Sequence, residues 1–407
     1  MPLRSWVPGA DGSLFGAENL PYGRFSRRGE TDARRGLAVA IGSYVLDLAG
    51  LVPVADLPPS LAGQTLNGFM AQGPEVWSAA RSRITRLLID HNERAHVEPY
   101  LVPIGEVDLH LPYQVGDYVD FYSSEAHATN VGRIFRPDQE PLSANWKHLP
   151  IGYHGRAGTV VVSGTPVVRP RGQSRPAGAE RPTFGPSTRL DIEAEVGFVV
   201  GKPSMWGAAI PVPGFADHVF GACLLNDWSA RDLQAWETVP LGPFLAKSFA
   251  TSVSPWLVPL AALSAARVRP PRRDPAPLPY LEDDADPWAL DISLEIRVNG
   301  DLVSHPPFAG MYWTAAQQLA HLTVNGASVR TGDLYASGTV SGTEPDERGS
   351  LLELTWNGQS PLSLSDGSSR SFLEDGDSVV ITGSAPGPDG TRIGFGEVAG
   401  RIRPAPA

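Results

Sequence analysis

"DFYSSEAHATNVG", residues 120–132, places a carboxylate, a phenol, two hydroxyls, a second carboxylate and a histidine within its first eight positions. The overlapping "DYVDF" has the alternating pattern of a strand, and the irregular composition after Phe121 indicates that the chain leaves this strand into a loop. A polar loop at the end of a rigid strand is a common place for functional residues. We therefore predict Asp120 as a metal ligand and His127 as a general base; the alternative is a polar surface loop with an ordinary histidine.

The composition predicts a globular chain built from many short strands. Of the 407 residues, 42% are hydrophobic and 19% are charged, and the 43 glycines and 39 prolines indicate frequent turns. The net charge of -11 argues against a nucleic-acid-binding face and against a polybasic membrane anchor. An acidic balance suits a site for a divalent cation, although solubility alone accounts for most of such a charge.

The cysteine content and the apolar runs bear on the compartment. Cys223 is the only cysteine, so neither an intrachain disulfide nor a thiolate metal cluster is expected. The segment "MPLRSWVPGADGSLFG" has no apolar core of the kind found in signal peptides, and no apolar run approaches the roughly 20 residues that cross a bilayer. We predict a cytoplasmic protein without a membrane anchor.

The chain before and after the opening stretch shows four larger patterns. Residues 36–51, "GLAVAIGSYVLDLAGL", predict a hairpin of two strands with its turn at Gly42. Residues 76–93 carry apolar side chains at three- and four-residue steps, which predicts a helix. Segments 169–188 and 268–287 are rich in proline and arginine, and we expect both to be long excursions without strands.

The stretch 190–201, "LDIEAEVGFVVG", gives a strong local signal for a cation site. Asp191, Glu193 and Glu195 alternate with apolar residues, so a strand would carry all three carboxylates on one face. Neighbours at positions i and i+2 lie about 6.6 Å apart on a strand, and like charges so placed repel each other unless a cation or solvent separates them. The alternative is an edge strand with a charged outer face.

A second polar group follows a buried-looking strand in "LLNDWSARDLQAWE", residues 224–237. Asp227 would lie at a strand-to-helix corner, with Ser229 as the N-cap of the helix that follows. On that helix Arg231 and Gln234 are three positions apart and share a face. The group suits a site that binds a metal and stabilises an anion; the alternative is a capped turn with Arg231 paired at the surface.

Two single charges lie within otherwise apolar stretches. Lys247 lies in "GPFLAKSF", where burial of an unpaired ammonium would be costly, so it either points outward or meets the carboxylates; we favour the second. Glu353 is the one charge in "SLLELTW", which we expect to be a strand. It is then either solvent-facing or a paired carboxylate that orients a histidine.

Taken together, five motifs resemble the fumarylacetoacetate hydrolase family over nearly the whole chain: "DFYSSEAHATNVG", "HLPIGYHGRA", "NDWSARDLQAWE", "GPFLAKSF" and "ASGTVSG". The resemblance implies a mainly β fold with some α, in which an SH3-like barrel (residues 1–115) precedes a catalytic β-roll of mixed sheets (residues 116–407). It also implies a homodimer with calcium, magnesium or both at each site.

The resemblance assigns roles to residues at the matching positions. His127 and Glu353 would form a base–orienter dyad, while Arg231, Gln234 and Lys247 would stabilise an alkoxide. The implied metal ligands are Asp120, Glu193, Glu195 and Asp227, with Asp227, Lys247 and Thr251 at a second, magnesium site. The implied substrate contacts are Tyr122, Arg136, Tyr153, Gln234, Thr238 and Thr339.

Two positions depart from the family pattern. Thr238 stands where animal members carry a tyrosine that touches the substrate, and Ala250 stands where they carry a glycine near the metal. Thr238 keeps a hydroxyl but loses reach and ring area. Both departures concern the finer substrate preference, not the type of reaction.

The implied reaction is hydrolysis of the carbon–carbon bond of 4-fumarylacetoacetate to fumarate and acetoacetate, the last step of tyrosine and phenylalanine breakdown. One alternative is a related hydrolase or decarboxylase of acylpyruvates or β-diketones on the same roll, although such relatives usually lack the N-terminal barrel. Another is a noncatalytic calcium-binding scaffold, which would leave His127, Glu353 and Lys247 unexplained.

Overall fold

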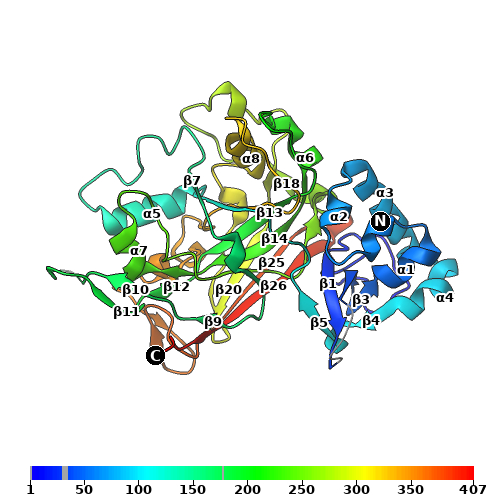
Figure 1. The fold of residues 1–407 in the computed structure, drawn as a ribbon, viewed down its shortest axis with the longest axis horizontal. Coiled ribbons are helices and arrows are strands. Elements are labelled where there is room, and N and C mark those ends of the chain that lie inside the picture. The colour runs from blue at the N-terminus through cyan, green and yellow to red at the C-terminus, as the bar shows by residue number, and fades with distance from the viewer. Residues whose placement is uncertain (1, 30–34, 177) are drawn as a thin grey trace.

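The first part of the chain forms a five-stranded antiparallel sheet of order β4-β3-β2-β1-β5, the barrel-like unit at the right of Figure 1. The computed structural model describes residues 2–29, 35–176 and 178–407. The strands of this unit are β1 (Tyr22–Arg27), β2 (Gly36–Ile41), β3 (Tyr44–Asp47), β4 (Leu101–Pro103) and β5 (Val107–His110). Its helices are α1 (Leu48–Ala55), α2 (Asn67–Met70), α3 (Pro74–Ile89) and α4 (Arg94–Val97).

Two sequence predictions are confirmed in this unit. β2 and β3 pair antiparallel with Ile41 opposite Tyr44, so the hairpin turns at Gly42, whose φ is +56°. Helix α3 covers most of the predicted helical segment and buries Ala80, Ile84 and Leu87 against the sheet. The helix and the hairpin therefore share one apolar core.

The second part of the chain is built on an eight-stranded mixed sheet of order β7-β6-β22-β13-β14-β16-β8, with β17 beside β14. Its strands are β6 (Tyr118–Phe121), β7 (Gly152–His154), β8 (Val160–Val162), β13 (Ala194–Val200), β14 (Val219–Asp227), β16 (Thr251–Val253), β17 (Val258–Pro259) and β22 (Leu334–Ala336). A second sheet, of order β21-β20-β25-β26-β9, comprises β9 (Val167–Val168), β20 (Ser293–Val298), β21 (Asp301–Ser304), β25 (Ser378–Pro386) and β26 (Arg392–Arg403).

Short pairs and helices complete this unit. The pairs are β10 (Arg171–Ser174) with β11 (Thr183–Pro186), β12 (Leu190–Asp191) with β15 (Ser229–Ala230), β18 (Arg267–Val268) with β19 (Ala289–Leu290), and β23 (Leu362–Ser363) with β24 (Ser369–Arg370). The helices are α5 (Glu125–Phe135), α6 (Phe215–His218), α7 (Arg231–Glu237), α8 (Ala315–Thr323) and α9 (Leu351–Leu354). None of the described helices combines the length and the apolar character that a membrane crossing requires.

Strand β13 is buried on both faces because it lies between two cores. Val196, Phe198 and Val200 pack into the core shared with the second sheet, and Val199 packs into the core shared with the N-terminal unit. This explains why "VGFVV" is a continuous apolar run rather than an alternating one.

The strand pairings bring distant parts of the sequence to one end of the large sheet. β13 starts where β14 ends, with Ala194 opposite Asn226, and Asp120 of β6 lies opposite Ala336 of β22. β22 in turn pairs with β13, Ala336 lying opposite Gly197. Polar side chains from β6, β13 and β14 are therefore placed side by side.

Three local predictions are wrong. Segment 169–188 contains the β10–β11 hairpin, which packs on α7: a Cβ added to Gly172 would lie 2.8 Å from Leu233. The chain after Phe121 runs through only three non-helical residues before α5 begins, so His127 is helical. Glu353 also lies in a helix, α9, and not in a strand. Segment 268–287, by contrast, has one 3-10 turn between β18 and β19, as expected of an excursion.

Candidate active site

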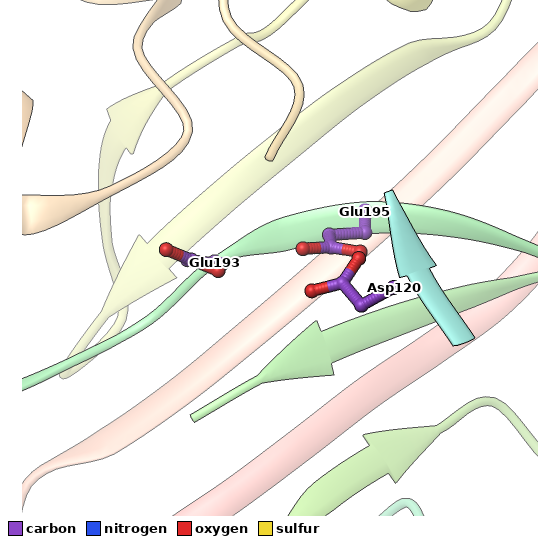
Figure 2. Close-up of side chains that lie close together, drawn as sticks. All are labelled: Asp120, Glu193 and Glu195. Carbon is purple, nitrogen blue, oxygen red and sulfur yellow. The ribbon is translucent and has the colours of Figure 1, made fainter. Parts of the chain in front are cut away.

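Three buried carboxylates converge at the end of the large sheet. Asp120 comes from β6, Glu195 from β13, and Glu193 from the residue pair that links β12 to β13 (Figure 2). One oxygen atom from each carboxylate lies within 4.8 Å of the other two. The side chains are almost inaccessible to solvent, so their mutual repulsion is not screened by water.

The oxygen atoms of this group fit a divalent cation. Asp120 Oδ1 and both carboxylate oxygens of Glu195 are buried and have no hydrogen-bond partner among the described residues. Burial, and then the charges of the neighbouring carboxylates, raise the pKa values of Asp120 and Glu195 well above their ordinary range. Hard cations such as calcium and magnesium bind oxygen ligands of this kind.

Two basic side chains balance part of the acidic charge. Lys247 Nζ contacts Glu193 Oε2 and lies 2.9 Å from Asp227 Oδ2, while Arg231 Nη1 lies 2.7 Å from Glu193 Oε1. Although burial opposes the shift, Lys247 and Arg231 lower the pKa of Glu193 to about 2. Glu193 is therefore a carboxylate at neutral pH, whereas burial and the neighbouring carboxylates make Asp120 and Glu195 harder to ionise than free carboxyl groups.

We expect opposite stability effects from removing the two kinds of carboxylate. An acid whose pKa is raised by folding makes the free energy of unfolding fall as pH rises from about 4 towards the folded-state pKa. In EDTA, Glu195→Gln should therefore melt at a higher temperature than the wild type, by a margin that grows as the pH rises above about 4. Glu193→Gln should melt at a lower temperature, because its depressed pKa contributes stability above about pH 4.

Thermal unfolding followed by circular dichroism checks this pair of variants. A Glu195→Gln protein that melts below the metal-free wild type at every pH would show that Glu195 is satisfied without a cation.

Asp227 lies next to the three-carboxylate group but is held by its own partners. Thr251 Oγ1 donates to Asp227 Oδ1 at 2.8 Å, and the Tyr153 hydroxyl donates to Asp227 Oδ2 at 2.8 Å. Lys247 bridges Asp227 and Glu193. Of the predicted members of the second cation site, Lys247 and Thr251 both contact Asp227, while the three-carboxylate group does not include Asp227.

His127 and Glu353 form a buried pair. His127 lies in the first turn of α5, where its backbone N–H donates to the N-cap residue Ser124, and its Nδ1 is 2.6 Å from Glu353 Oε2. Because an ionised Glu353 can only accept, Nδ1 must carry the proton that it donates, and in a neutral imidazole the lone pair is then on Nε2. The arrangement suits an imidazole that takes up a proton at Nε2.

Glu353 is kept ionised by several donors. Ser350 Oγ and Ser341 Oγ donate to Oε2 at 2.8 and 3.0 Å, and Asn130 Nδ2 donates to Oε1 at 3.0 Å. Burial alone would raise the pKa of Glu353, but His127 and these hydrogen bonds lower it. The sequence signals for these donors were weak: Asn130 lies one helical turn after His127, and Ser350 precedes Glu353 with N-cap spacing.

The corner after β14 differs from the prediction in one detail. Ser229 does not cap α7; its hydroxyl donates to the backbone oxygen of Asp227, and the N-cap position is Ala230. Arg231 and Gln234 do share a face of α7, with Arg231 Nη1 3.1 Å from Gln234 Oε1. The surface pairing considered for Arg231 is wrong, because the side chain is buried against Asp191 and Glu193.

The remaining predicted substrate contacts are spread around this group. Tyr122 stacks edge-on against His127 with ring centroids 5.2 Å apart, and buried Thr339 Oγ1 has no hydrogen-bond partner among the described residues. Arg136 is exposed and donates to the Pro141 backbone, and the Thr238 hydroxyl donates to the Gln234 backbone at 2.6 Å. Among the described residues, no hydrogen bond or ion pair joins the side chain of Arg136 or Thr238 to His127 or to the three carboxylates.

Two cavities are lined by predicted site residues. One, of about 410 Å³, is lined by Tyr153, Asp227 and Lys247 among others. The other, of about 510 Å³, is lined by Tyr122 and Arg136. The first cavity therefore includes one of the predicted substrate contacts, Tyr153, and the second includes two others, Tyr122 and Arg136.

Comparisons with known proteins agree with this geometry. Residues 18–112 match the family model "Fumarylacetoacetase N-terminal", and residues 118–403 match "Fumarylacetoacetate (FAA) hydrolase C-terminal". The chain belongs to the fumarylacetoacetate hydrolase family. It is a hydrolase, and members of this family depend on a metal ion.

Similar proteins extend over the full length of this hydrolase. It is 48% identical to fumarylacetoacetase of Homo sapiens, covering 98% of this chain and 99% of the relative. It is 48% identical to fumarylacetoacetase of Caenorhabditis elegans, covering 99% and 100% respectively. A solved fumarylacetoacetate hydrolase from Exiguobacterium antarcticum shares the fold at 17% identity, with a TM-score of 0.55 over 95% of this chain and 99% of that one.

Proposed function

We propose that the chain hydrolyses the carbon–carbon bond of 4-fumarylacetoacetate to fumarate and acetoacetate, the closing step of tyrosine breakdown. The observation that carries this proposal is the buried His127–Glu353 pair beside three convergent carboxylates. Two buried basic side chains, Arg231 and Lys247, lie against these carboxylates. The full-length similarity to fumarylacetoacetases supports the same substrate.

The residues have complementary roles in the proposed mechanism. His127 Nε2 takes a proton from water, and Glu353 stabilises the imidazolium that forms. The hydroxide adds to a ketone carbonyl of the substrate, and Arg231, Gln234 and Lys247 stabilise the developing alkoxide. The carbon–carbon bond then breaks, its electron pair leaves with the acetoacetate carbon as an enolate, and the imidazolium returns its proton to that carbon.

Four carboxylates would hold the divalent cation, calcium or magnesium: Asp120, Glu193, Glu195 and Asp227. When bound, the ion supplies Lewis acidity to the diketone oxygens and so makes the enolate a better leaving group. In this proposal Tyr122, Tyr153 and Thr339 would contact the substrate, and Arg136 is suited to a substrate carboxylate.

A substrate panel tests the proposed activity. Loss of ultraviolet absorbance should follow addition of fumarylacetoacetate, and kcat/KM should be at least about tenfold higher than for any acylpyruvate, which corresponds to about 1.4 kcal/mol of transition-state binding. A higher kcat/KM for an acylpyruvate would assign the chain to a related hydrolase of the same fold.

We also propose a homodimer. Val239, Leu241, Phe244 and Leu245 follow α7 close to Lys247 and are 85%, 96%, 59% and 51% exposed. Such a group of exposed apolar side chains is typical of an interface. Light scattering after gel filtration should give about twice the 43.4 kDa chain mass, and Val239→Ser with Leu241→Ser should weaken the dimer. A monomeric wild type would contradict this proposal.

The cytoplasm remains the proposed compartment. The lone Cys223 is buried and gives no reason to expect an oxidising environment. Fractionation of cells that express the chain tests the location.

A further inference from the structure

Asp191 is a buried carboxylate to which none of the roles above is assigned. It is the last residue of β12, is fully buried, and lies two positions before Glu193. The sequence suggested that it shares a strand face with Glu193 and Glu195. That expectation is wrong, because regular pairing stops between β12 and β13, and the Asp191 side chain is directed to other partners.

Four N–H groups donate to the two oxygens of Asp191. Oδ1 accepts from the backbone N–H groups of Ile192 and Leu351, each at 2.7 Å. Oδ2 accepts from Arg231 Nε at 2.7 Å and from the Leu352 N–H at 3.0 Å. If residue 191 were asparagine, its NH₂ group would face two N–H donors whichever way the amide was turned. The surroundings therefore favour a carboxylate, whose two oxygens can both accept.

The bond to Arg231 sets which guanidinium nitrogen is available. Asp191 occupies Nε, while Glu193 and Gln234 occupy Nη1. Nη2 is buried and has no hydrogen-bond partner among the described residues. Asp191 therefore holds the planar guanidinium so that one N–H-bearing nitrogen remains for an oxyanion.

The bonds to Leu351 and Leu352 fix the start of α9. These N–H groups lie in the first turn of the helix and would otherwise be unsatisfied. The next residue is Glu353, which holds His127 Nδ1. The Asp191 carboxylate thus contacts both Arg231 and helix α9, and α9 carries Glu353, the partner of His127.

We propose that Asp191 is a positioning residue that fixes Arg231 and the Glu353–His127 pair relative to each other. This rests on the proposed function, in which these groups act on one substrate. The bonds from Asp191 are made before substrate binds, so their loss should act on turnover more than on affinity.

Asp191→Asn provides the kinetic test. We expect kcat to fall about 10- to 100-fold, with KM changed less than about threefold. In the Arg231→Ala background the same replacement should lower kcat by a smaller factor, because only the bonds to α9 then remain to be lost. Asp377→Asn is the matched control, because Asp377 is a buried carboxylate that binds Arg370 and a backbone N–H away from the site. It should leave kcat unchanged. Independent, multiplicative effects of Asp191→Asn and Arg231→Ala would overturn the proposal.

A spectroscopic readout separates this proposal from the substrate assignment. The short His127–Glu353 hydrogen bond should give a downfield Nδ1–H proton signal in the wild type and in Asp377→Asn, and Asp191→Asn should broaden or shift it. An unchanged signal would overturn the proposal, whatever the substrate. Asp191→Ser is a second variant with the same expectations. If both Asp191 variants fail to fold while Asp377→Asn folds, Asp191 is structural and the proposal is wrong.

Discussion

Replacing His127 by asparagine is expected to lower kcat for fumarylacetoacetate by roughly 10²- to 10⁴-fold, the usual effect of losing a general base. Asparagine can still pair with Glu353 but cannot take up a proton at neutral pH. The side chain is small enough for the buried site at the start of α5, so folding should be retained. Steady-state kinetics, together with the metal content of the purified variant, measures the effect.

The control is His305→Asn. His305 is also a histidine near a carboxylate, with Nε2 3.6 Å from Asp346 Oδ2, but both side chains are exposed. Its replacement should leave kcat unchanged. Full turnover by His127→Asn with the metal still bound would remove His127 from the mechanism.

Replacing Asp120 by asparagine should abolish tight binding of the divalent cation and reduce turnover by at least about 100-fold. Losing a partner that only orients a metal ligand already costs roughly 10- to 100-fold in affinity or activity, and a ligand should cost more. Asp120 Oδ1 has no hydrogen-bond partner among the described residues, so the replacement breaks no bond at that atom. Calorimetric titration with calcium and with magnesium measures the binding.

Asp117→Asn is the matched control for Asp120→Asn. Asp117 lies just before β6, is exposed, and accepts a hydrogen bond from the Tyr118 N–H. Its replacement should change neither metal binding nor turnover. If Asp120→Asn binds the cation as tightly as the wild type, Asp120 is not a ligand.

The sequence predicts individual elements where the pattern is local, and the overall architecture through the family resemblance. The hairpin at Gly42 and helix α3 follow from short-range periodicity, and the mixed-sheet roll with its N-terminal barrel followed from the family resemblance. The structure brings Asp120, Glu193 and Glu195 together although they come from segments about seventy positions apart in the chain. Spacing along the chain could only suggest this; the β6–β22–β13 pairing produces it.

The failures arose where tertiary contacts override local pattern. "SLLEL" has the apolar content of a strand, but Ser350 caps the segment and Asp191 binds its first N–H groups, which favours the short helix α9. The β10–β11 hairpin is supported by its contact with α7, which no turn signal in the segment reveals. The expectation that Asp191 shares a strand face with Glu193 and Glu195 is wrong because strand periodicity cannot show where a strand is interrupted.

The most direct measurement of the central claim is the position of a bound cation. Crystals soaked in manganese, which scatters anomalously and takes the oxygen ligands of magnesium and calcium, should show a peak between the four proposed ligands, with oxygens at about 2.0–2.6 Å. These ligands are Asp120, Glu193, Glu195 and Asp227. In the same map, the His127 imidazole should lie close enough to the ion for one substrate molecule to contact both. A peak elsewhere, or carboxylates that turn away from one another with no ion between them, would contradict this account of the site.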